Sequence, residues 1–285
     1  MTAPIKLDWF RSLKNLPSLP EQINSVLVAT GSTSSMDYNI VEIIQYDPSM
    51  ALSVLKVANS PIYGFSGRIS SLQQASGLLG PGAIKNIILR TPVLERYLTN
   101  CQEGPIDFGD LWVHSGVTAA LSGGLGRLFG DVESDVCFTA GLIYDTGVIA
   151  LSAYFYHELA EAFELSRNKN ISLFEAEKKV FGFTSSQVSL TLMKAWNFPE
   201  LLSDIYSLDT NSFEPNFVSK PAAVVALAKS LAKEWGYASY PHIQYEFSKE
   251  NLLQVLKITA EDLSDWEPDL RKYAALALDV VKGKN

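Results

Sequence analysis

The sequence predicts an all-α protein made of two packed helical lobes. Apolar residues recur at helical spacing along most of the 285 residues, and convincing period-two strands are absent. Proline and glycine interrupt the first third of the chain at short intervals, whereas longer helical stretches follow the turn-rich segment 101–107. We therefore expect an N-terminal lobe over residues 1–104 and a second helical lobe over residues 105–285.

Start and stop signals place short helices along the first lobe. Pro20 is positioned to begin a helix over residues 21–29, and an apolar stripe predicts another over 36–46. Asp47 before Pro48 predicts the next start, because a capping carboxylate accepts free amide donors and proline presets φ. We expect that helix to stop near residues 59–61.

The lobe closes with two more predicted helices. The serines at 70–71 cap one that ends at Gly80, and Pro81 opens the next, which Pro92 kinks or breaks. Glycine ends helices and proline starts them, so a break between these two is expected.

The second lobe is predicted to contain longer helices, with a less regular stretch over residues 236–267. Glycines at 123–126 lie inside the first of these helices, where they cost helix propensity and indicate a neighbouring helix passing close by. The predicted helices cover residues 108–129, 134–145, 147–167, 172–181, 185–196, 199–207, 218–235 and 268–282.

Composition excludes several classes of function. A net charge of −8 argues against general affinity for nucleic acid or anionic lipid, whose phosphates an acidic surface repels. Cys101 and Cys137 are too few for a disulfide framework or a zinc cluster. No run of roughly 20 uninterrupted apolar residues and no signal architecture stand out. We expect a cytoplasmic protein with neither a nucleic-acid nor a membrane partner.

The most informative motif is the apolar segment 141–147, which delivers one carboxylate, Asp145. A His-Asp pair in such a setting supplies two adjacent metal ligands. Tyr144 stands before this aspartate instead, and a phenol is a poor ligand while it keeps its proton, since its ordinary pKa is about 10.

Several motifs together resemble the HDOD family, the output-domain relatives of HD-type metal-dependent phosphohydrolases. They fall in the family's order and cover roughly residues 13–235; the residues past about 236 lie outside. The resemblance implies that the second lobe has the helical core of an HD domain. The matching segments are 47–64, 69–80, 111–115, 140–147 and 195–199.

Carried over by this resemblance, the metal site is degenerate. His114 and Asp145 match family ligands, but Lys229 stands where catalytic members have a distal aspartate. An ammonium opposes a dication and has no lone pair to offer, so two surviving ligands do not hold a metal with an open position for water. We expect no catalytic residue, no metal and no cofactor. The degenerate positions are His114, Tyr144, Asp145, Ser185, Asp209 and Lys229.

Local roles are predicted for the charged site residues. Asp145 is expected to pair with Lys229 or His114 in place of the lost ion. We expect His114 to be a hydrogen-bonded core histidine; the alternative is a residue that contacts a ligand. The acidic and basic residues at 175–179 read as a solvated helix face.

Other residues are candidates for contacts with a partner or ligand. Tyr63 and Phe65 flank a glycine on a predicted loop, where they serve as partner anchors or insert between the lobes. Arg90, with Lys229, is a candidate phosphate contact in a nucleotide-sensing site.

These observations favour a non-catalytic module of bacterial signal transduction, a pseudoenzyme that docks a protein partner or senses a nucleotide-like ligand. The alternative is a divergent metal-dependent phosphohydrolase acting on nucleotides or a cyclic dinucleotide. That enzyme needs new ligands beside His114 and Asp145, such as Asp209.

Overall fold

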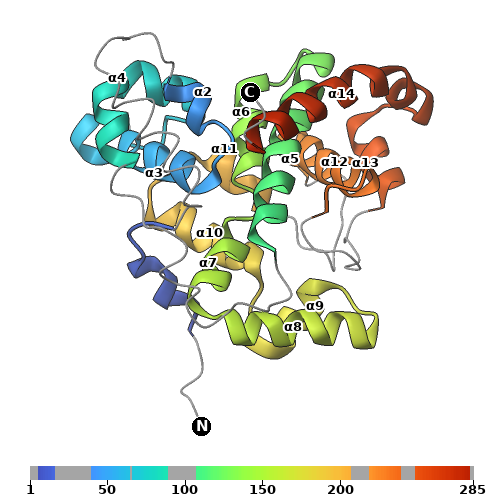
Figure 1. The fold of residues 1–285 in the computed structure, drawn as a ribbon, viewed down its shortest axis with the longest axis horizontal. Coiled ribbons are helices and arrows are strands. Elements are labelled where there is room, and N and C mark those ends of the chain that lie inside the picture. The colour runs from blue at the N-terminus through green and yellow to red at the C-terminus, as the bar shows by residue number, and fades with distance from the viewer. Residues whose placement is uncertain are drawn as a thin grey trace.

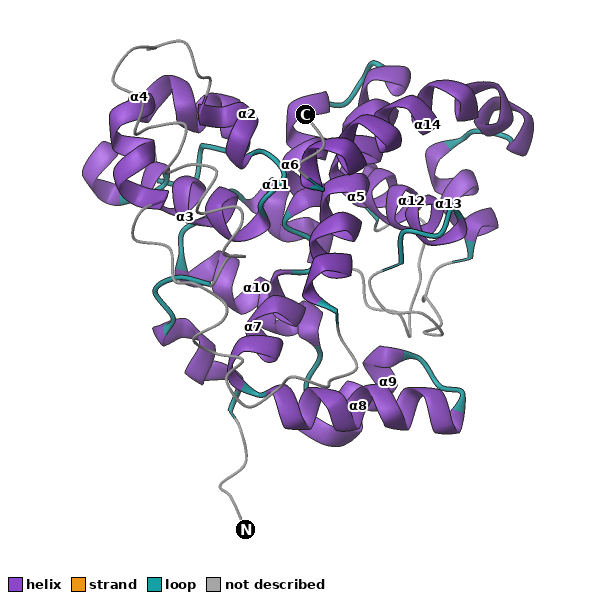
Figure 2. Ribbon diagram, in the orientation of Figure 1, coloured by secondary structure: helices purple, strands orange, loops and turns teal. Residues whose placement is uncertain are grey.

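The chain is helical throughout the part that the computed structural model describes, namely residues 6–16, 40–64, 66–88, 107–206, 218–238 and 248–282. No strand occurs in these ranges, which confirms the predicted fold class (Figure 2). Figure 1 shows α2, α3 and α4 on one side of the molecule and α12, α13 and α14 on the other, with α5 between them. The boundary predicted at residues 104–105 lies outside the described ranges and stays a prediction.

The N-terminal elements follow the predicted start and stop signals. Gly80 leaves the helical conformation, with φ 73° and ψ 163°, so α4 consists of two helical pieces that meet before Pro81, as predicted. The helix predicted over 21–29 and the kink at Pro92 lie outside the described residues. The elements are η1 (Leu7–Ser12), α2 (Ile40–Ile44), α3 (Pro48–Ala58), η2 (Pro61–Tyr63) and α4 (Leu72–Ile88).

Asp47 connects the N-terminal helices to the centre of the fold. Its Oδ1 accepts the Met50 amide at 2.7 Å, which confirms the predicted cap of α3. Its Oδ2 accepts the indole Nε1–H of Trp112 on α5 at 2.9 Å, and Asp47 and Trp112 are both completely buried. Because a buried carboxylate is stable only with such partners, one side chain both begins α3 and fixes it against α5.

Asn59 fixes the loop that follows α3. Its Nδ2 donates to the carbonyls of Leu55 and Ile69 at 3.0 and 2.8 Å. Its Oδ1 accepts the amides of Arg68 and Ile69 at 3.1 and 3.0 Å. The buried amide group therefore joins the end of α3 to residues 68 and 69.

The longer helices pack around α5, whose predicted close contacts are present. A Cβ added at Gly124 would lie 2.6 Å from the Tyr273 ring of α14, and one at Gly126 would lie 3.1 Å from the Cα of Ser134 on α6. The elements are α5 (Phe108–Phe129), α6 (Ser134–Leu142), α7 (Thr146–Tyr154), α8 (Tyr156–Lys169), α9 (Leu173–Phe181), α10 (Ser185–Ala195), α11 (Glu200–Ser203), η4 (Asp204–Tyr206), α12 (Lys220–Glu234), α13 (Lys249–Leu256) and α14 (Ala260–Val281).

Two predicted helices differ from the structure. The single helix expected over 147–167 is divided at Phe155, whose backbone has φ −139°, and whose ring packs against Trp9 and Phe10 at centroid distances of 5.0 and 5.6 Å. The aromatic contacts favour this break over an uninterrupted helix. The helix expected to begin at Pro268 instead begins at Ala260, where Thr259 and Asp262 form a capping box.

One stretch of the described residues, Ser134–Tyr154, has the length and composition of a membrane-spanning helix, with a mean hydropathy of 1.5. The stretch contains Asp135 and Asp145, so it is not an uninterrupted apolar run. Within the fold, 83% of the apolar window is buried, and a turn at residues 143–145 separates α6 from α7 inside it.

The Asp47–Trp112 contact predicts a measurable loss of stability. Trp112→Phe removes the indole N–H and leaves the buried Oδ2 of Asp47 without that donor. We expect this to lower the free energy of unfolding by about 1–3 kcal/mol. Urea unfolding monitored by circular dichroism checks this. Trp9→Phe, at a side chain that is 40% exposed, is the matched control. Equal losses in the two variants would contradict a special role for the Asp47 contact.

Candidate functional site

The candidate site forms where α5, the turn between α6 and α7, and α12 meet. His114 comes from α5, Asp145 begins α7, and Lys229 comes from α12. Asp145 occupies the N-cap position without capping its own helix through its side chain, so its carboxylate is directed to other groups. Gly147 lets α7 approach α10, since a Cβ there would lie 1.9 Å from the Ser185 carbonyl oxygen.

Asp145 and Lys229 form a buried ion pair. Lys229 Nζ donates to Asp145 Oδ1 at 2.9 Å, and the two side chains are only 12% and 5% exposed. The other carboxylate oxygen, Oδ2, lies 3.7 Å from His114 Nε2. The predicted pairing of Asp145 is therefore present with Lys229, whereas His114 lies nearby without a hydrogen bond to the carboxylate.

His114 is held as a neutral imidazole. Its Nδ1 lies 2.7 Å from the carbonyl oxygen of Tyr237, an acceptor only, which assigns the ring proton to Nδ1. Complete burial lowers the pKa of His114, and the nearby Asp145 offsets this only in part. Nε2 makes no hydrogen bond with the described residues. This orientation, with Nδ1 bound to a carbonyl and a bare Nε2, is the one that metal-binding histidines adopt.

Tyr144 contributes a ring face rather than a ligand atom. Lys229 Nζ lies 4.1 Å from the centroid of the Tyr144 ring, within the range of a cation–π contact. Tyr206 packs beside this ring at 5.9 Å and donates its hydroxyl hydrogen to the Ile143 carbonyl, in the turn that precedes Asp145. The ammonium is therefore held between a carboxylate and an aromatic face.

Glu177 is a second buried carboxyl beside the site, and the sequence analysis was wrong to place it on a solvated face. It lies on α9, is completely buried, and its Oε2 accepts the Ser185 amide at 2.7 Å and the Ser185 hydroxyl at 3.0 Å. Burial raises its pKa to about 7, although the Ser185 hydrogen bonds and Lys229 oppose the rise. The overlooked signal was spacing, since Glu177 lies four residues from both Leu173 and Phe181 on the buried stripe of α9.

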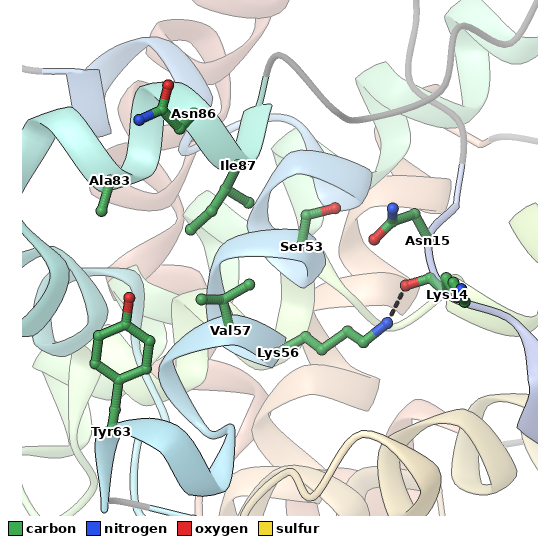
Figure 3. A pocket seen from close by; sticks show the side chains of 9 residues that line it. All are labelled: Lys14, Asn15, Ser53, Lys56, Val57, Tyr63, Ala83, Asn86 and Ile87. Carbon is green, nitrogen blue, oxygen red and sulfur yellow. Dashed lines mark hydrogen bonds between the residues drawn. The ribbon is translucent and has the colours of Figure 1, made fainter.

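Two of the other predicted site residues, Ser185 and Tyr63, have different surroundings. Ser185 is buried, and its hydroxyl donates a hydrogen bond to Glu177 rather than to Asp145. Tyr63 lies away from this site, is 38% exposed, and lines a hollow between α3 and α4 (Figure 3). Asp209, Phe65 and Arg90 lie outside the described residues.

Among the described residues, the donor atoms at this site do not fit a divalent metal ion. Within the described ranges, no three histidine, cysteine, aspartate or glutamate side chains come together as metal ligands. One neutral imidazole and one carboxylate remain, and the carboxylate is already neutralised by Lys229. A dication there would have to displace an ammonium, and it would lack the three protein ligands of a catalytic site.

Comparison with known proteins adds a family and a fold. The model of the HDOD domain family matches residues 16–211. The crystal structure of the MmoQ response regulator from Methylococcus capsulatus is similar with a TM-score of 0.68 and 21% identity, covering 89% of this chain and 98% of that one. An HDOD domain protein of unknown function from Geobacter sulfurreducens has a TM-score of 0.54 and 19% identity, covering 96% and 97%.

An uncharacterized protein of Treponema pallidum is a curated relative. It is 21% identical over 265 residues, which is 88% of this chain. The chain spans about half of that relative's length, 49%.

Because Asp145 and Lys229 form a buried ion pair, removing the lysine alone should lower the free energy of unfolding more than removing both charges. Lys229→Met leaves the Asp145 carboxylate buried without its cation, so we expect the free energy of unfolding to fall by about 3–5 kcal/mol. Adding Asp145→Asn should recover much of that loss, as measured by urea unfolding at pH 7. Lys272→Met is the matched control, because that lysine pairs with Asp269 while 73% exposed and should change stability by less than about 1 kcal/mol. If the double variant lost the sum of the free energies that the two single variants lose, the pairing would be contradicted.

Glu177 predicts a pH dependence of stability. A folded pKa of about 7, above the ordinary 4.5, means that the native state keeps a proton which the unfolded state releases. Protonated Glu177 contributes fully to the free energy of unfolding below pH 4.5. This contribution, on the order of 3 kcal/mol at 1.36 kcal/mol per pKa unit, is lost as the pH rises through 7. Glu177→Gln mimics the protonated acid and keeps an acceptor for Ser185.

We therefore expect Glu177→Gln to match the wild type near pH 4.5 and to exceed its stability at pH 8. Urea unfolding of both proteins across this range measures the difference. A constant difference at all pH values would show that Glu177 does not titrate between 4.5 and 7.

Proposed function

Because the chain belongs to the HDOD domain family, we propose that it is a non-catalytic module of signal transduction that docks a protein partner. The family and the likeness of fold to a response regulator support a signalling role. The observation that carries the non-catalytic part is the Lys229 ammonium, held between Asp145 and the Tyr144 ring.

Hydrolysis of a phosphodiester by an HD-type site needs a metal ion that activates water. Here the carboxylate that would bind the ion is paired with Lys229, and the imidazole Nε2 of His114 lies 3.7 Å from its second oxygen. The ammonium cannot ionise a water molecule as a Lewis acid does. The residues therefore support a structural role, in which an internal cation holds α5, α7 and α12 together.

The same geometry argues against a nucleotide bound at Lys229, and it favours a protein partner that binds the outer surface instead. A phosphate group needs positive charge that is not already neutralised, and the charge of Lys229 is matched by Asp145. Glu177 adds a second carboxyl nearby, and its interaction with Asp145 is repulsive. His114 and Asp145 are also buried, so a ligand would have to open the helix packing to reach them. Recognition through the outer surface of the helices needs no such opening.

Metal analysis with a matched restored variant tests the proposal. We expect the wild-type chain, incubated with Mn²⁺ or Ni²⁺ and desalted, to retain far less than one equivalent by mass spectrometry, and to leave bis(p-nitrophenyl) phosphate intact. Combining Tyr144→His with Lys229→Asp supplies ligands beside His114 and Asp145, and should raise metal retention.

Two results would overturn the non-catalytic assignment. One is stoichiometric metal in the wild type that is lost in Asp145→Asn. The other is metal-dependent hydrolysis by the wild type that Asp145→Asn abolishes. Thermal shifts with nucleotides address the sensing alternative, because a tight ligand must stabilise the folded chain.

A further inference from the structure

A hollow of about 520 Å³ lies between α3 and α4, away from the buried ion pair (Figure 3). In Figure 3 the Tyr63 ring stands at one side of the hollow, the Val57 and Ile87 side chains lie in the middle, and the Lys56 ammonium reaches toward the Lys14 carbonyl at the other side. The hollow is open to the outside rather than enclosed. It is therefore shaped for a protruding segment of another molecule.

Positive charge gathers at one end of this hollow. Among the described residues, Lys14 and Lys56 line it together, with no aspartate or glutamate beside them in the lining. The Lys56 ammonium donates to the Lys14 carbonyl and lies 4.8 Å from the centroid of the Trp196 ring, which fixes its position. Burial lowers the pKa of Lys56, and the charge of Lys14 lowers it further. Two neighbouring cations on a chain of net charge −8 form a local site for carboxylates.

Exposed apolar side chains occur on η2, the element that supplies Tyr63 to the hollow. Ile62 is 90% exposed and Tyr63 38% exposed, both on η2. The loop that carries them is fixed by the four hydrogen bonds of Asn59, and Gly64 ends η2 with φ 74°. We call the combined surface the α3–α4 groove; it comprises Lys14, Lys56, Val57, Ile62, Tyr63 and Ile87.

We propose that the α3–α4 groove docks an acidic segment of a partner protein. The segment places a bulky apolar side chain against Val57 and Ile87, a second one against Ile62, and carboxylates beside Lys14 and Lys56. This inference rests on the proposed docking function and names the chemistry of its partner. The exposed Ile62 extends the apolar surface beyond the hollow, which favours an extended or helical peptide over a compact small molecule.

Selection from a phage library of random twelve-residue peptides on the full chain tests this. We expect the enriched peptides to carry net negative charge and at least one bulky apolar residue. A fluorescein-labelled copy of an enriched peptide should bind the wild type with an affinity that falls as salt rises, because surface charges are screened. Ile62→Asp and Lys14→Glu should each weaken it roughly tenfold or more, about 1.4 kcal/mol at least.

Matched controls exist elsewhere on the chain. Leu276→Asp changes another exposed apolar side chain, 62% exposed on α14, and Lys179→Glu changes an exposed lysine on α9. Both should leave binding unchanged. Ile62 and Lys14 are exposed, so their variants should unfold in urea as the wild type does.

Three outcomes of the peptide experiment would overturn the proposal. They are no enrichment, enriched peptides without acidic residues, and binding that Ile62→Asp leaves intact. If light scattering instead shows a dimer that Ile62→Asp and Lys14→Glu dissociate, the groove's occupant is a second copy, which also overturns it. The metal assay is independent of this surface, so failure here leaves the non-catalytic assignment standing.

Discussion

The buried pair of Asp145 and Lys229 is the interaction on which the centre of the molecule depends. It joins the turn before α7 to α12, and His114 of α5 lies against its second oxygen. A buried carboxylate needs a cation or hydrogen-bond donors beside it. Lys229 supplies a cation for Asp145 from within the chain. The imidazole keeps the orientation of a metal ligand although its Nε2 faces a carboxylate at 3.7 Å.

The surrounding helices are arranged to make this pair possible. Gly147 brings α7 against α10, and a Cβ at Gly141 would lie 2.5 Å from the Ser122 hydroxyl of α5, so both ends of the turn at 143–145 are packed without room for side chains. Farther out, Asp47 attaches α3 to Trp112, two positions before His114 on α5. The N-terminal helices and the site therefore share α5 as a common support.

Local signals predicted much of the fold, because caps and breaks are decided by neighbouring residues. The cap at Asp47 and the break at Gly80 are of this kind, whereas the charge replacement at Lys229 followed from the resemblance to the HDOD family. Features set by distant contacts were missed. Phe155 interrupts a helix to reach Trp9, which is far away in sequence. For Glu177 the helical spacing to Leu173 and Phe181 was a local signal of burial, but the Ser185 contact from α10 that satisfies its carboxyl could not be predicted locally.

The four hydrogen bonds of Asn59 have a consequence for association kinetics and affinity. A recognition loop that is ordered before contact loses little conformational freedom on binding, so more of the contact energy appears as affinity. The exposed tip at Ile62 is thus preorganised by one amide side chain buried beneath it. Loosening Asn59 would slow productive encounters and weaken the complex without altering a single atom of the contacting surface.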